Sequence, residues 1–577
     1  MNNYLIKKRL GWLLKVMSML LLCVACSSKQ TNDANQRSPK KVIVVHARGL
    51  TYPEISKYLS ANNAEGFFKQ KSVKGLIKKL YPITNAVTIS NIASFETGAM
   101  PSKHGIIGHL YGLRKNDSIK ITSGFAQRFA VETFWEKADL AGKKVLKVGA
   151  LTLHGKSDKH TNVDCLAQGS QIGGAQIIRL IPVKEATEKN IIKYKSLAGN
   201  FALPQPKGFT GSVFIYKSTQ DSAWILDNDY NPNNGVYAKA NRGDWFELEN
   251  KTAKGKKETL KKQAFRAKLT SVSNDTLTLY IRPAYENRGY PNGFIKKVDT
   301  DLGASRGWPN ISFYAANKIS AKTLTEEINT EVEYVMKAFS ATTQNKDYDL
   351  IMVDYPLMDR LGHAFLHIKD SSQEVKQYYQ AAYKRMNKDF SQIEDFAKKN
   401  GYELMITSGH GFSVSKTSID LNKLLGKQGI KAYNKTNDWE VMAVPGKVSA
   451  HVYLNPQLSE NERIILTAKV KDAFQKLQEL KTKNSVVDKV YQKNELTELG
   501  LFHKNAGDLY VLLKPGYIFE NNAHKNGDFW GIPTFKGDHG YSLKHEDSYG
   551  VLVSQDQCDP CRSIDVAKVI EQKLKLR

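Results

Sequence analysis

The sequence predicts a doubly wound α/β domain built around a mostly parallel sheet. Continuous β-branched runs recur along the chain, and amphipathic helical segments lie between them. The chain has 577 residues, of which 41% are hydrophobic and 24% charged, so it is globular and buries a large core. Because strands and helices alternate, we expect parallel strands with loops gathered at their carboxyl ends.

The first predicted strand is the run KVIVVHARGL at residues 41–50. Similar runs at 143–152, 348–355 and 402–409 are typical of strands buried on both faces of a sheet. Helical spacing over 322–343 and 372–400 precedes the last two strands, and an amphipathic helix is expected at 563–576. The predicted α/β core comprises residues 41–167, 313–420 and 536–577.

Two segments interrupt the alternation of strands and helices. Residues 168–312 are β-rich and include a hairpin pattern around Asn274-Asp275, which predicts a β-rich insertion. Residues 421–535 are expected to form an α+β cap over the site. Within the cap, the capping-box pattern from Ser459 to Glu462 precedes a helical spacing of apolar residues.

The N-terminal residues 1–25 contain Lys7, Lys8 and Arg9 followed by a short apolar stretch, the pattern of a secretion signal. Small residues precede Cys26, which resembles a bacterial lipoprotein signal and implies that Cys26 is lipidated. The alternatives are a plain anchor helix and a simple cleaved signal. Residues 26–40 are polar and form a tether. We therefore expect a lipid-anchored protein of the bacterial cell envelope, in the periplasm or at the cell surface.

The formal net charge is +27, and four of these charges lie in residues 1–25. The lysines are spread along the chain without a run that follows a helix or a nucleic-acid-binding motif. We interpret them as a solvated surface, with adhesion to anionic lipid as a secondary possibility and no specific nucleic-acid partner. The sequence does not indicate an oligomeric state.

The sequence has five cysteines, of which Cys23 and Cys26 belong to the signal segment. The pair Cys558 and Cys561 is spaced for a small disulfide, a redox motif or a metal clip. A redox motif normally opens a helix after the first strand of its own small domain, whereas this pair lies near the end of a large chain. We therefore favour a structural disulfide over free thiols.

Residues 87–109, VTISNIASFETGAMPSKHGIIGH, form a small-residue stretch that opens a helix. Thr88 lies near the helix start, where a hydroxyl and backbone N–H groups converge on an anion, although a threonine there also serves as a cap. The string resembles the alkaline phosphatase superfamily, particularly its nucleotide pyrophosphatase/phosphodiesterases and its predicted phosphohydrolase/phosphomutase branch. The matching residues are Thr88 and Asn91, Thr97-Gly98, Pro101 and His104-Gly105-Ile106.

The resemblance continues through residues 41–577 and implies an alkaline-phosphatase-like fold. Asp359 and His363 stand in the family's Asp-x-x-Gly-His motif, and His539 stands at its late histidine ligand, with His545 as an alternative. The resemblance implies that Thr88 is the nucleophile. It also implies a zinc ion on Asp359, His363 and His539 with one position open for a phosphate oxygen.

The sequence departs from the family at two carboxylates that hold a second metal ion. Arg48 replaces one aspartate, and Gly409 replaces the other in Ser408 to Gly411. We therefore expect one zinc site and no complete second one, with His410 either a relic or a functional contact. Arg48 can replace part of the lost charge because its planar fork suits a phosphate. Further candidates for the site are His46 and the replacement carboxylates Asp354 and Asp538.

The sequence therefore predicts an exported lipoprotein that hydrolyses a phosphate monoester or diester, with Thr88 attacking phosphorus and with Asn91 and Arg48 holding oxygens. The alternative is a catalytically inactive binding or assembly lipoprotein of the same fold. A sulfatase is disfavoured because Thr88 occupies the nucleophile position without a Cys/Ser-x-Pro-x-Arg string. The sequence does not identify the substrate.

Overall fold

The computed structural model describes residues 40–61, 64–116, 118–188, 191–196, 214–219, 222–226, 236–248, 265–272, 277–344, 346–433, 438–479, 482–520 and 528–576. The predicted signal segment 1–25, Cys26 with the tether up to residue 39, and the hairpin tip Asn274-Asp275 lie outside these residues. Among the described helices, none combines the length and the apolar character that a membrane span requires.

A nine-stranded sheet forms the centre of the fold, in the order β15-β6-β5-β16-β1-β17-β26-β2-β27. The four predicted strands are β1, β5, β16 and β17, and they pair in parallel. Strand β26 is antiparallel to both of its neighbours, and β15 is antiparallel to β6. The predicted doubly wound α/β fold is thus confirmed. The strands are β15 (Ala284–Tyr290), β6 (Val163–Gly173), β5 (Val145–Ala150), β16 (Leu350–Tyr355), β1 (Lys41–Ala47), β17 (Tyr402–Ser408), β26 (Gly550–Val553), β2 (Ile77–Tyr81) and β27 (Cys561–Arg562).

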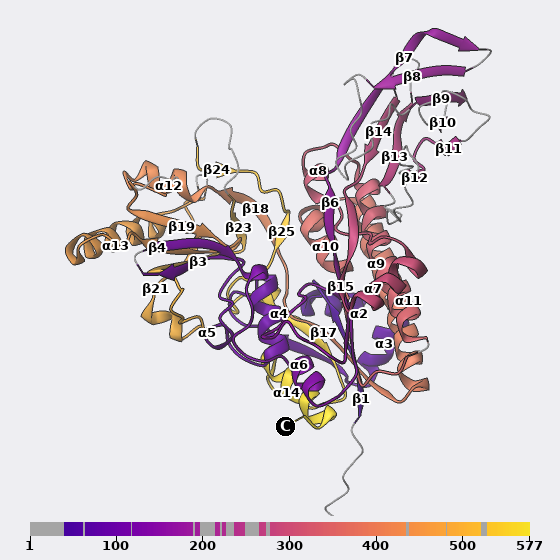
Figure 1. Cartoon of the computed structure of the whole chain (residues 1–577). Coiled ribbons are helices and arrows are strands. Elements are labelled where there is room, and N and C mark those ends of the chain that lie inside the picture. The colour runs from indigo at the N-terminus through magenta and orange to yellow at the C-terminus, as the bar shows by residue number, and fades with distance from the viewer. Residues whose placement is uncertain are drawn as a thin grey trace, which may run out of the picture. The chain divides into compact units, whose positions relative to one another are not determined.

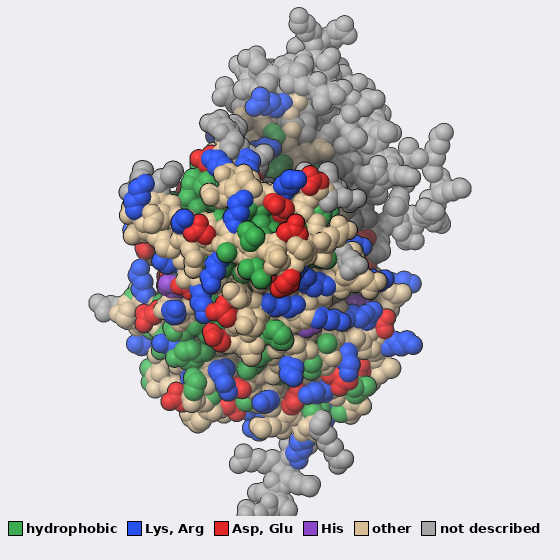
Figure 2. Space-filling view, turned by 90° about the vertical axis from the view of Figure 1, so that its left-hand side faces the viewer, with side chains coloured by type: hydrophobic (Ala, Val, Ile, Leu, Met, Phe, Trp, Pro, Cys, Tyr) green, Lys and Arg blue, Asp and Glu red, His purple; other side chains and the backbone are tan. Residues whose placement is uncertain are grey.

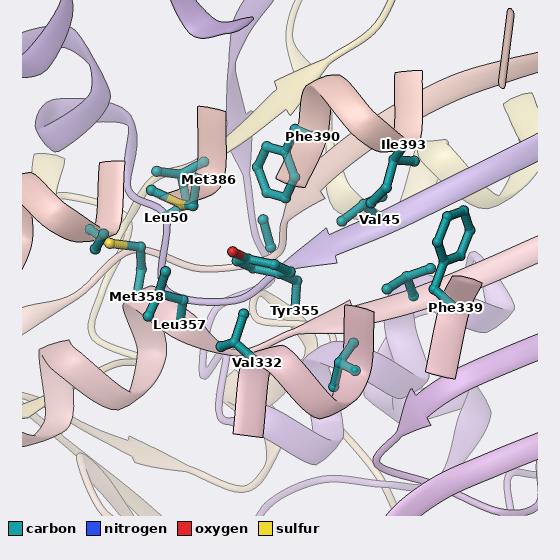
Figure 3. Packing of buried hydrophobic residues seen from close by; sticks show 14 of the residues in the cluster. Val45, Leu50, Val332, Phe339, Tyr355, Leu357, Met358, Met386, Phe390 and Ile393 are labelled. Atoms are coloured by element: carbon teal, nitrogen blue, oxygen red, sulfur yellow. The ribbon is translucent and has the colours of Figure 1, made fainter. Parts of the chain in front are cut away.

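Strand β1 shows why the central runs are continuously hydrophobic. Ile43 and Val45 point to one buried cluster, whereas Val42 and Val44 point to a second cluster on the opposite face. Successive side chains of a strand alternate between faces, so a strand covered on both sides needs apolar residues at every position. Figure 3 shows the first cluster, in which Tyr355 packs among side chains of the flanking helices.

Helices cover both faces of the sheet, with α9 and α11 on one side and α4, α6 and α14 on the other (Figure 1). Helix α4 begins at Thr88, and all of its residues are buried. It ends where Gly98 adopts a left-handed conformation with φ of 63°, which favours glycine. The main helices are α2 (Tyr52–Ser60), α3 (Gly66–Val73), α4 (Thr88–Thr97), α6 (Phe134–Leu140), α7 (Asn292–Leu302), α9 (Ala321–Thr343), α10 (Leu357–Phe365), α11 (Gln373–Lys399) and α14 (Ser563–Leu574).

A separate eight-stranded sheet lies within the predicted β-rich insertion, in the order β11-β10-β9-β8-β7-β14-β13-β12. All neighbouring strands of this sheet are antiparallel. Its strands are β7 (Gln176–Glu188), β8 (Ile191–Ser196), β9 (Phe214–Thr219), β10 (Ser222–Leu226), β11 (Val236–Asn241), β12 (Trp245–Leu248), β13 (Phe265–Val272) and β14 (Leu277–Ile281).

The predicted cap segment contains an antiparallel sheet in the order β19-β20-β22-β21 and helices α12 and α13. Ser459 and Glu462 form the predicted capping box, in which each side chain accepts a hydrogen bond from the other residue's backbone N–H. The elements are β19 (Val441–Pro445), β20 (Ser449–Leu454), β21 (Val487–Gln492), β22 (Leu509–Leu513), α12 (Leu421–Lys427) and α13 (Glu460–Gln475). Nearby strands are β18 (Ser413–Ile419), β23 (Gly516–Phe519), β24 (Trp530–Gly531) and β25 (Gly537–Asp538).

The face in Figure 2 carries Lys and Arg side chains interspersed with acidic and hydrophobic ones. The basic residues on this face do not gather into a single stripe. Interspersed charges of both signs are typical of a solvated surface.

Candidate active site

Three parallel strands bring the candidate residues to one edge of the central sheet. His46 near the end of β1 stands in register with Asp354 of β16 and with Thr407 of β17. Arg48 follows β1 directly, and His410 lies two residues beyond the end of β17. Because these strands run in the same direction, residues far apart in the sequence meet at their carboxyl ends.

The centre of the site is the Asp359 carboxylate on helix α10. Its Oδ1 atom lies 3.7 Å from His363 Nε2, 3.9 Å from His410 Nε2 and 4.0 Å from His539 Nε2. Asp359, His410 and His539 are buried, and the rings of the two histidines stack with their centroids 3.6 Å apart. We call these four residues the Asp359 cluster.

Each histidine of the Asp359 cluster is oriented by the backbone through its other ring nitrogen. A ring nitrogen that faces a carbonyl carries the proton, so Nδ1 donates and Nε2 keeps its lone pair. Burial lowers the pKa of His539 to about 3 and that of His410 well below its ordinary value, so both rings are neutral near pH 7. The accepting carbonyls are Gly537 for His363 (2.9 Å), Gly411 for His410 (2.9 Å) and Ala86 for His539 (2.7 Å).

The donor atoms of the Asp359 cluster suit a divalent metal ion. Asp359 Oδ1 and His410 Nε2 are buried and have no hydrogen-bond partner among the described residues. The ligand atoms of Asp359, His410 and His539 lie within 4.8 Å of one another. Neutral imidazole nitrogens and a carboxylate oxygen are ligands that zinc accepts, and buried groups of this kind are costly unless something binds them.

The second oxygen of Asp359 is held by two arginines. Its Oδ2 atom accepts hydrogen bonds from Arg48 at 3.1 Å and from Arg360 at 3.0 Å. Arg360 also forms a two-pronged ion pair with Glu331 of α9, at 2.9 and 2.8 Å. Burial alone would raise the pKa of Asp359, but Arg48, His363 and Arg360 outweigh it and hold the pKa well below its usual range. Asp359 is therefore ionised and ready to bind a cation.

Protein groups fill the region around Arg48 and Gly409, where the resemblance predicts the two carboxylates of a second metal site. Arg48 Nε donates to Asp354 Oδ1 at 3.0 Å, and His46 Nδ1 lies 3.2 Å from the same oxygen. A Cβ atom at Gly409 would overlap the Asn91 amide and lie 3.3 Å from His46 Nε2. An aspartate at residue 409 therefore has no room unless Asn91 moves. Asp354 is the counter-ion of Arg48 in this arrangement.

Thr88, the first residue of α4, lines the same cavity as the candidate metal-ligand residues. The cavity measures about 540 Å³, and Arg48, Asp359, His363 and His539 also line it. Asn91 lies one helical turn after Thr88, and neither atom of its amide has a hydrogen-bond partner among the described residues.

Asp538 and His545 occupy different positions relative to this site. Asp538 lines the cavity, its Oδ2 atom has no partner among the described residues, and its ligand atom lies within 4.8 Å of those of His363 and His539. His545 belongs to neither group of candidate metal ligands.

Cys558 and Cys561 are joined by a disulfide, and Cys165 is free and buried.

Glu331 and Trp308 belong to the surroundings of the site, and no motif identified them. Glu331 lies inside a long amphipathic helix, where acidic residues are common. Trp308 lies in the predicted β-rich insertion, after strand β15, and the guanidinium carbon of Arg360 lies 3.7 Å from its ring centroid. Only the tertiary fold brings Glu331 and Trp308 close to Asp359, and no sequence spacing relates them.

Structural similarity extends over nearly the whole chain. Human ectonucleotide pyrophosphatase/phosphodiesterase 5 has 12% identity and a TM-score of 0.46, and the alignment covers 93% of this chain and 96% of that one. The murine protein, in an inactive form in complex with AMP, has 11% identity with the same coverage and TM-score. Phosphonoacetate hydrolase from Sinorhizobium meliloti 1021, in complex with phosphonoformate, has 11% identity, a TM-score of 0.48 and the same coverage.

No curated protein sequence matches this chain. The family model for type I phosphodiesterase/nucleotide pyrophosphatase matches residues 42–542, which include the Asp359 cluster, Thr88, Arg48 and Gly409. This span is most of the chain and confirms the resemblance inferred from the motifs. The chain is a member of the type I phosphodiesterase/nucleotide pyrophosphatase family, a metal-dependent family of phosphoester hydrolases within the alkaline phosphatase superfamily.

Proposed function

We propose that this chain hydrolyses a phosphate ester with Thr88 as the nucleophile and with a single bound zinc ion. The observation that carries the proposal is the approach of three imidazole nitrogens to the Asp359 carboxylate, beside a cavity that Thr88 also lines. A few N and O donors next to an open cavity suit a catalytic zinc site. The proposed zinc ligands are Asp359, His363 and His539, which leaves a fourth position open for a phosphate oxygen, and His410 Nε2 is a further neighbour at 3.9 Å from Asp359 Oδ1.

The proposed reaction has two steps. When bound, zinc supplies positive charge that stabilises the phosphoryl oxygens. Thr88 Oγ attacks phosphorus and loses its proton to solvent, and the bond from phosphorus to the leaving oxygen breaks as the new O–P bond forms. Because α4 begins at Thr88, its first N–H groups and positive end are available to the phosphoryl anion. Water then attacks the phosphothreonine, which releases phosphate and restores the hydroxyl.

Arg48 and Asn91 are proposed to hold the non-bridging oxygens. Arg48 Nη2 and both amide atoms of Asn91 are buried without a hydrogen-bond partner among the described residues. Their unused donors match a phosphate, which accepts several hydrogen bonds at once. Neither group stabilises an alkoxide as a second metal ion does. We therefore expect slow turnover, since one lost transition-state contact commonly costs on the order of 10²–10³ in rate.

The second candidate function is a binding or assembly protein that keeps the fold without turnover. The ion pairs of Arg48 favour it, because Asp354 and Asp359 already neutralise the guanidinium. The hydroxyl of Thr88 then lacks the activation that a threonine nucleophile needs at neutral pH. In this alternative the Asp359 cluster binds a metal ion only for structure.

The test combines metal content with hydrolysis of aryl phosphate monoesters and diesters. We expect about one zinc per chain and slow release of the phenol, which Thr88→Ala abolishes while zinc remains bound. Thr497→Ala, at an exposed position in the predicted cap segment, is the matched control and keeps its activity. Turnover that survives Thr88→Ala would exclude Thr88 as the nucleophile. Absence of turnover with every ester would favour the binding protein.

We also propose that the chain is a lipoprotein anchored at the membrane through Cys26. The basic residues 7–9, the apolar stretch and the small residues before Cys26 support this. In a bacterial host, we expect the wild-type chain to incorporate labelled palmitate and to be found in the membrane fraction. Cys26→Ser should lose both, and a labelled Cys26→Ser chain would refute the assignment.

A further inference from the structure

The charged residues that line the 540 Å³ cavity are not evenly distributed. Its acidic lining residues among those described are Asp359 and Asp538, and both belong to groups of candidate metal ligands. Arg128 and Arg288 line the cavity elsewhere. Because both acidic lining residues belong to the candidate metal ligands, these arginines create a positive potential in the rest of the cavity, which attracts a negatively charged group.

The basic part of the cavity lies to one side of the metal ligands along the sheet. Thr152 follows β5, which is two strand positions from β1, and Gln168 lies in β6, the third position. Arg48 follows β1 at the same edge, since Ala47 is in register with Tyr355 of β16. Neighbouring strands are about 4.8 Å apart, so Thr152 and Gln168 lie roughly 10–14 Å from Arg48 along the sheet, and the backbone of β15, the fourth position, lies roughly 19 Å from it.

Arg288 comes from β15, the strand next to β6, and is paired in register with Ala167. Ala167 also lines the cavity. Arg288 is exposed and forms no ion pair with any residue that the structure describes. Its guanidinium therefore has free donors at the cavity. Arg128 is paired at 2.9 Å with Asp158, whose side chain is 57% exposed, so solvent screens that pair.

Two buried polar groups on the loop after β5 lack partners. Thr152 is 8% exposed, lines the cavity, and has a hydroxyl without a hydrogen-bond partner among the described residues. His154 also lines the cavity, stacks on Tyr290 with centroids 5.8 Å apart, and leaves Nδ1 without a partner. A buried hydroxyl without a partner is costly, which indicates that a ligand or water completes it.

We propose that this part of the cavity binds a second anionic group of the substrate. The site, which we call the second-anion subsite, consists of Arg128, Thr152, His154 and Arg288. Resting on the proposed function, it assigns the substrate to phosphate esters that carry another phosphate or carboxylate roughly 10–14 Å from the scissile phosphorus. An aryl phosphate whose aryl group carries no charge occupies only the metal end of the cavity. It leaves Arg128 and Arg288 without an anionic partner in the substrate.

The test measures binding without depending on turnover. Calorimetry on the zinc-loaded protein compares α,ω-bisphosphonates of increasing bridge length with alkyl monophosphonates of the same length. We expect the tightest binding where the two phosphonates stand roughly 10–14 Å apart. At that length the bisphosphonate should bind at least about tenfold more tightly than the monophosphonate. This is the gain in affinity expected from one additional charge-assisted hydrogen bond.

Arg288→Gln should remove most of this preference, and Arg288→Lys, which keeps the charge but not the fork, should restore part of it. Arg562→Gln is the matched control, since Arg562 is an exposed arginine paired with Asp565 at 2.8 Å, outside the cavity lining. Zinc content is measured for every variant. Equal binding of the two ligand series by the wild type, or a preference that Arg288→Gln leaves intact, would overturn the subsite.

The outcome is distinguishable from a failure of the proposed hydrolysis. A bisphosphonate preference that depends on Arg288 supports the subsite even in a chain that turns over no ester. Turnover of simple aryl esters without such a preference supports the hydrolase and refutes the subsite.

Discussion

Placing aspartates at residues 48 and 409 tests the proposal that these two positions belong to a second metal site that this chain lacks. Arg48→Asp removes the guanidinium from between Asp354 and Asp359, to which it donates at 3.0 and 3.1 Å. Breaking a buried ion pair by removing one partner costs about 3–5 kcal/mol. The new aspartate adds a further negative charge at the same place, so the metal-free variant should lose at least this much stability.

The second substitution, Gly409→Asp, meets a steric obstacle. The Asn91 amide occupies the space of a side chain at residue 409, and His46 Nε2 lies 3.3 Å from the position of its Cβ. Asn91 is buried within α4, so it has to rotate away before the carboxylate fits. We expect Gly409→Asp alone to be destabilising, and a cation to favour the rotated arrangement in the double variant.

Zinc should recover part of the stability lost in the double variant, because the ion binds the folded state. At a free zinc concentration one hundred times the dissociation constant, this linkage provides about 2.7 kcal/mol. The assay is thermal unfolding with zinc and with a chelator, together with the zinc content per chain. We expect one more zinc per chain than in the wild type and faster hydrolysis of diesters.

Arg48→Met is the matched control, since it removes the ion pairs without supplying a ligand. It should be destabilised and should not regain stability through an additional zinc. A folded double variant that binds no more zinc than the wild type and shows no faster diesterase would refute the assignment of residues 48 and 409 to the second metal site.

Three further predictions follow from individual contacts. The free energy of unfolding should fall as the pH drops from about 6.5 towards 4. Burial lowers the pKa of His104 to about 3 and that of His451 to about 4, so the unfolded chain binds protons that the folded chain does not. Replacing His451 with glutamine should make the free energy of unfolding, measured by chemical denaturation, less dependent on pH, and an unchanged dependence would contradict the assignment. Ser459→Ala removes the capping box of α13 and should cost about 1 kcal/mol, as seen in urea unfolding, whereas Ser459→Asp should retain most of the stability. Asp359→Asn should reduce the zinc content several-fold, and a variant with full zinc content would exclude Asp359 as a ligand. The substitution also leaves Arg48 and Arg360 without their shared carboxylate.

Much of the fold could be predicted because its signals are local. The runs that become β1, β5, β16 and β17 are apolar at every position, as burial on both faces requires. Strands β2, β26 and β27 were not predicted. Strand β26 is four residues long, and β27 has two, so neither contains enough residues for a periodic pattern.

The site could be predicted only in part, because motifs identify residue types but not their partners. The motifs identified Asp359, His363 and His539 through the family resemblance. The sequence left His410 as either a relic or a functional contact, and its Nε2 atom lies 3.9 Å from Asp359 Oδ1. One carboxylate oxygen of Asp359 contacts arginines and the other faces histidines, and this arrangement depends on tertiary packing. No spacing in the chain encodes it.

The Asp359 cluster draws its last member from residue 539, close to the C-terminus, while Thr88 comes from the first part of the same chain. Contacts of such sequence separation are slow to form, since their loop-closure entropy must be overcome before they stabilise anything. During synthesis, the pocket for the cation cannot exist until almost all of the polypeptide has emerged. With the proposed zinc site, loading of the ion is thus a late event of biogenesis, and a product truncated before β25 would carry the earlier proposed ligands without a place to hold metal.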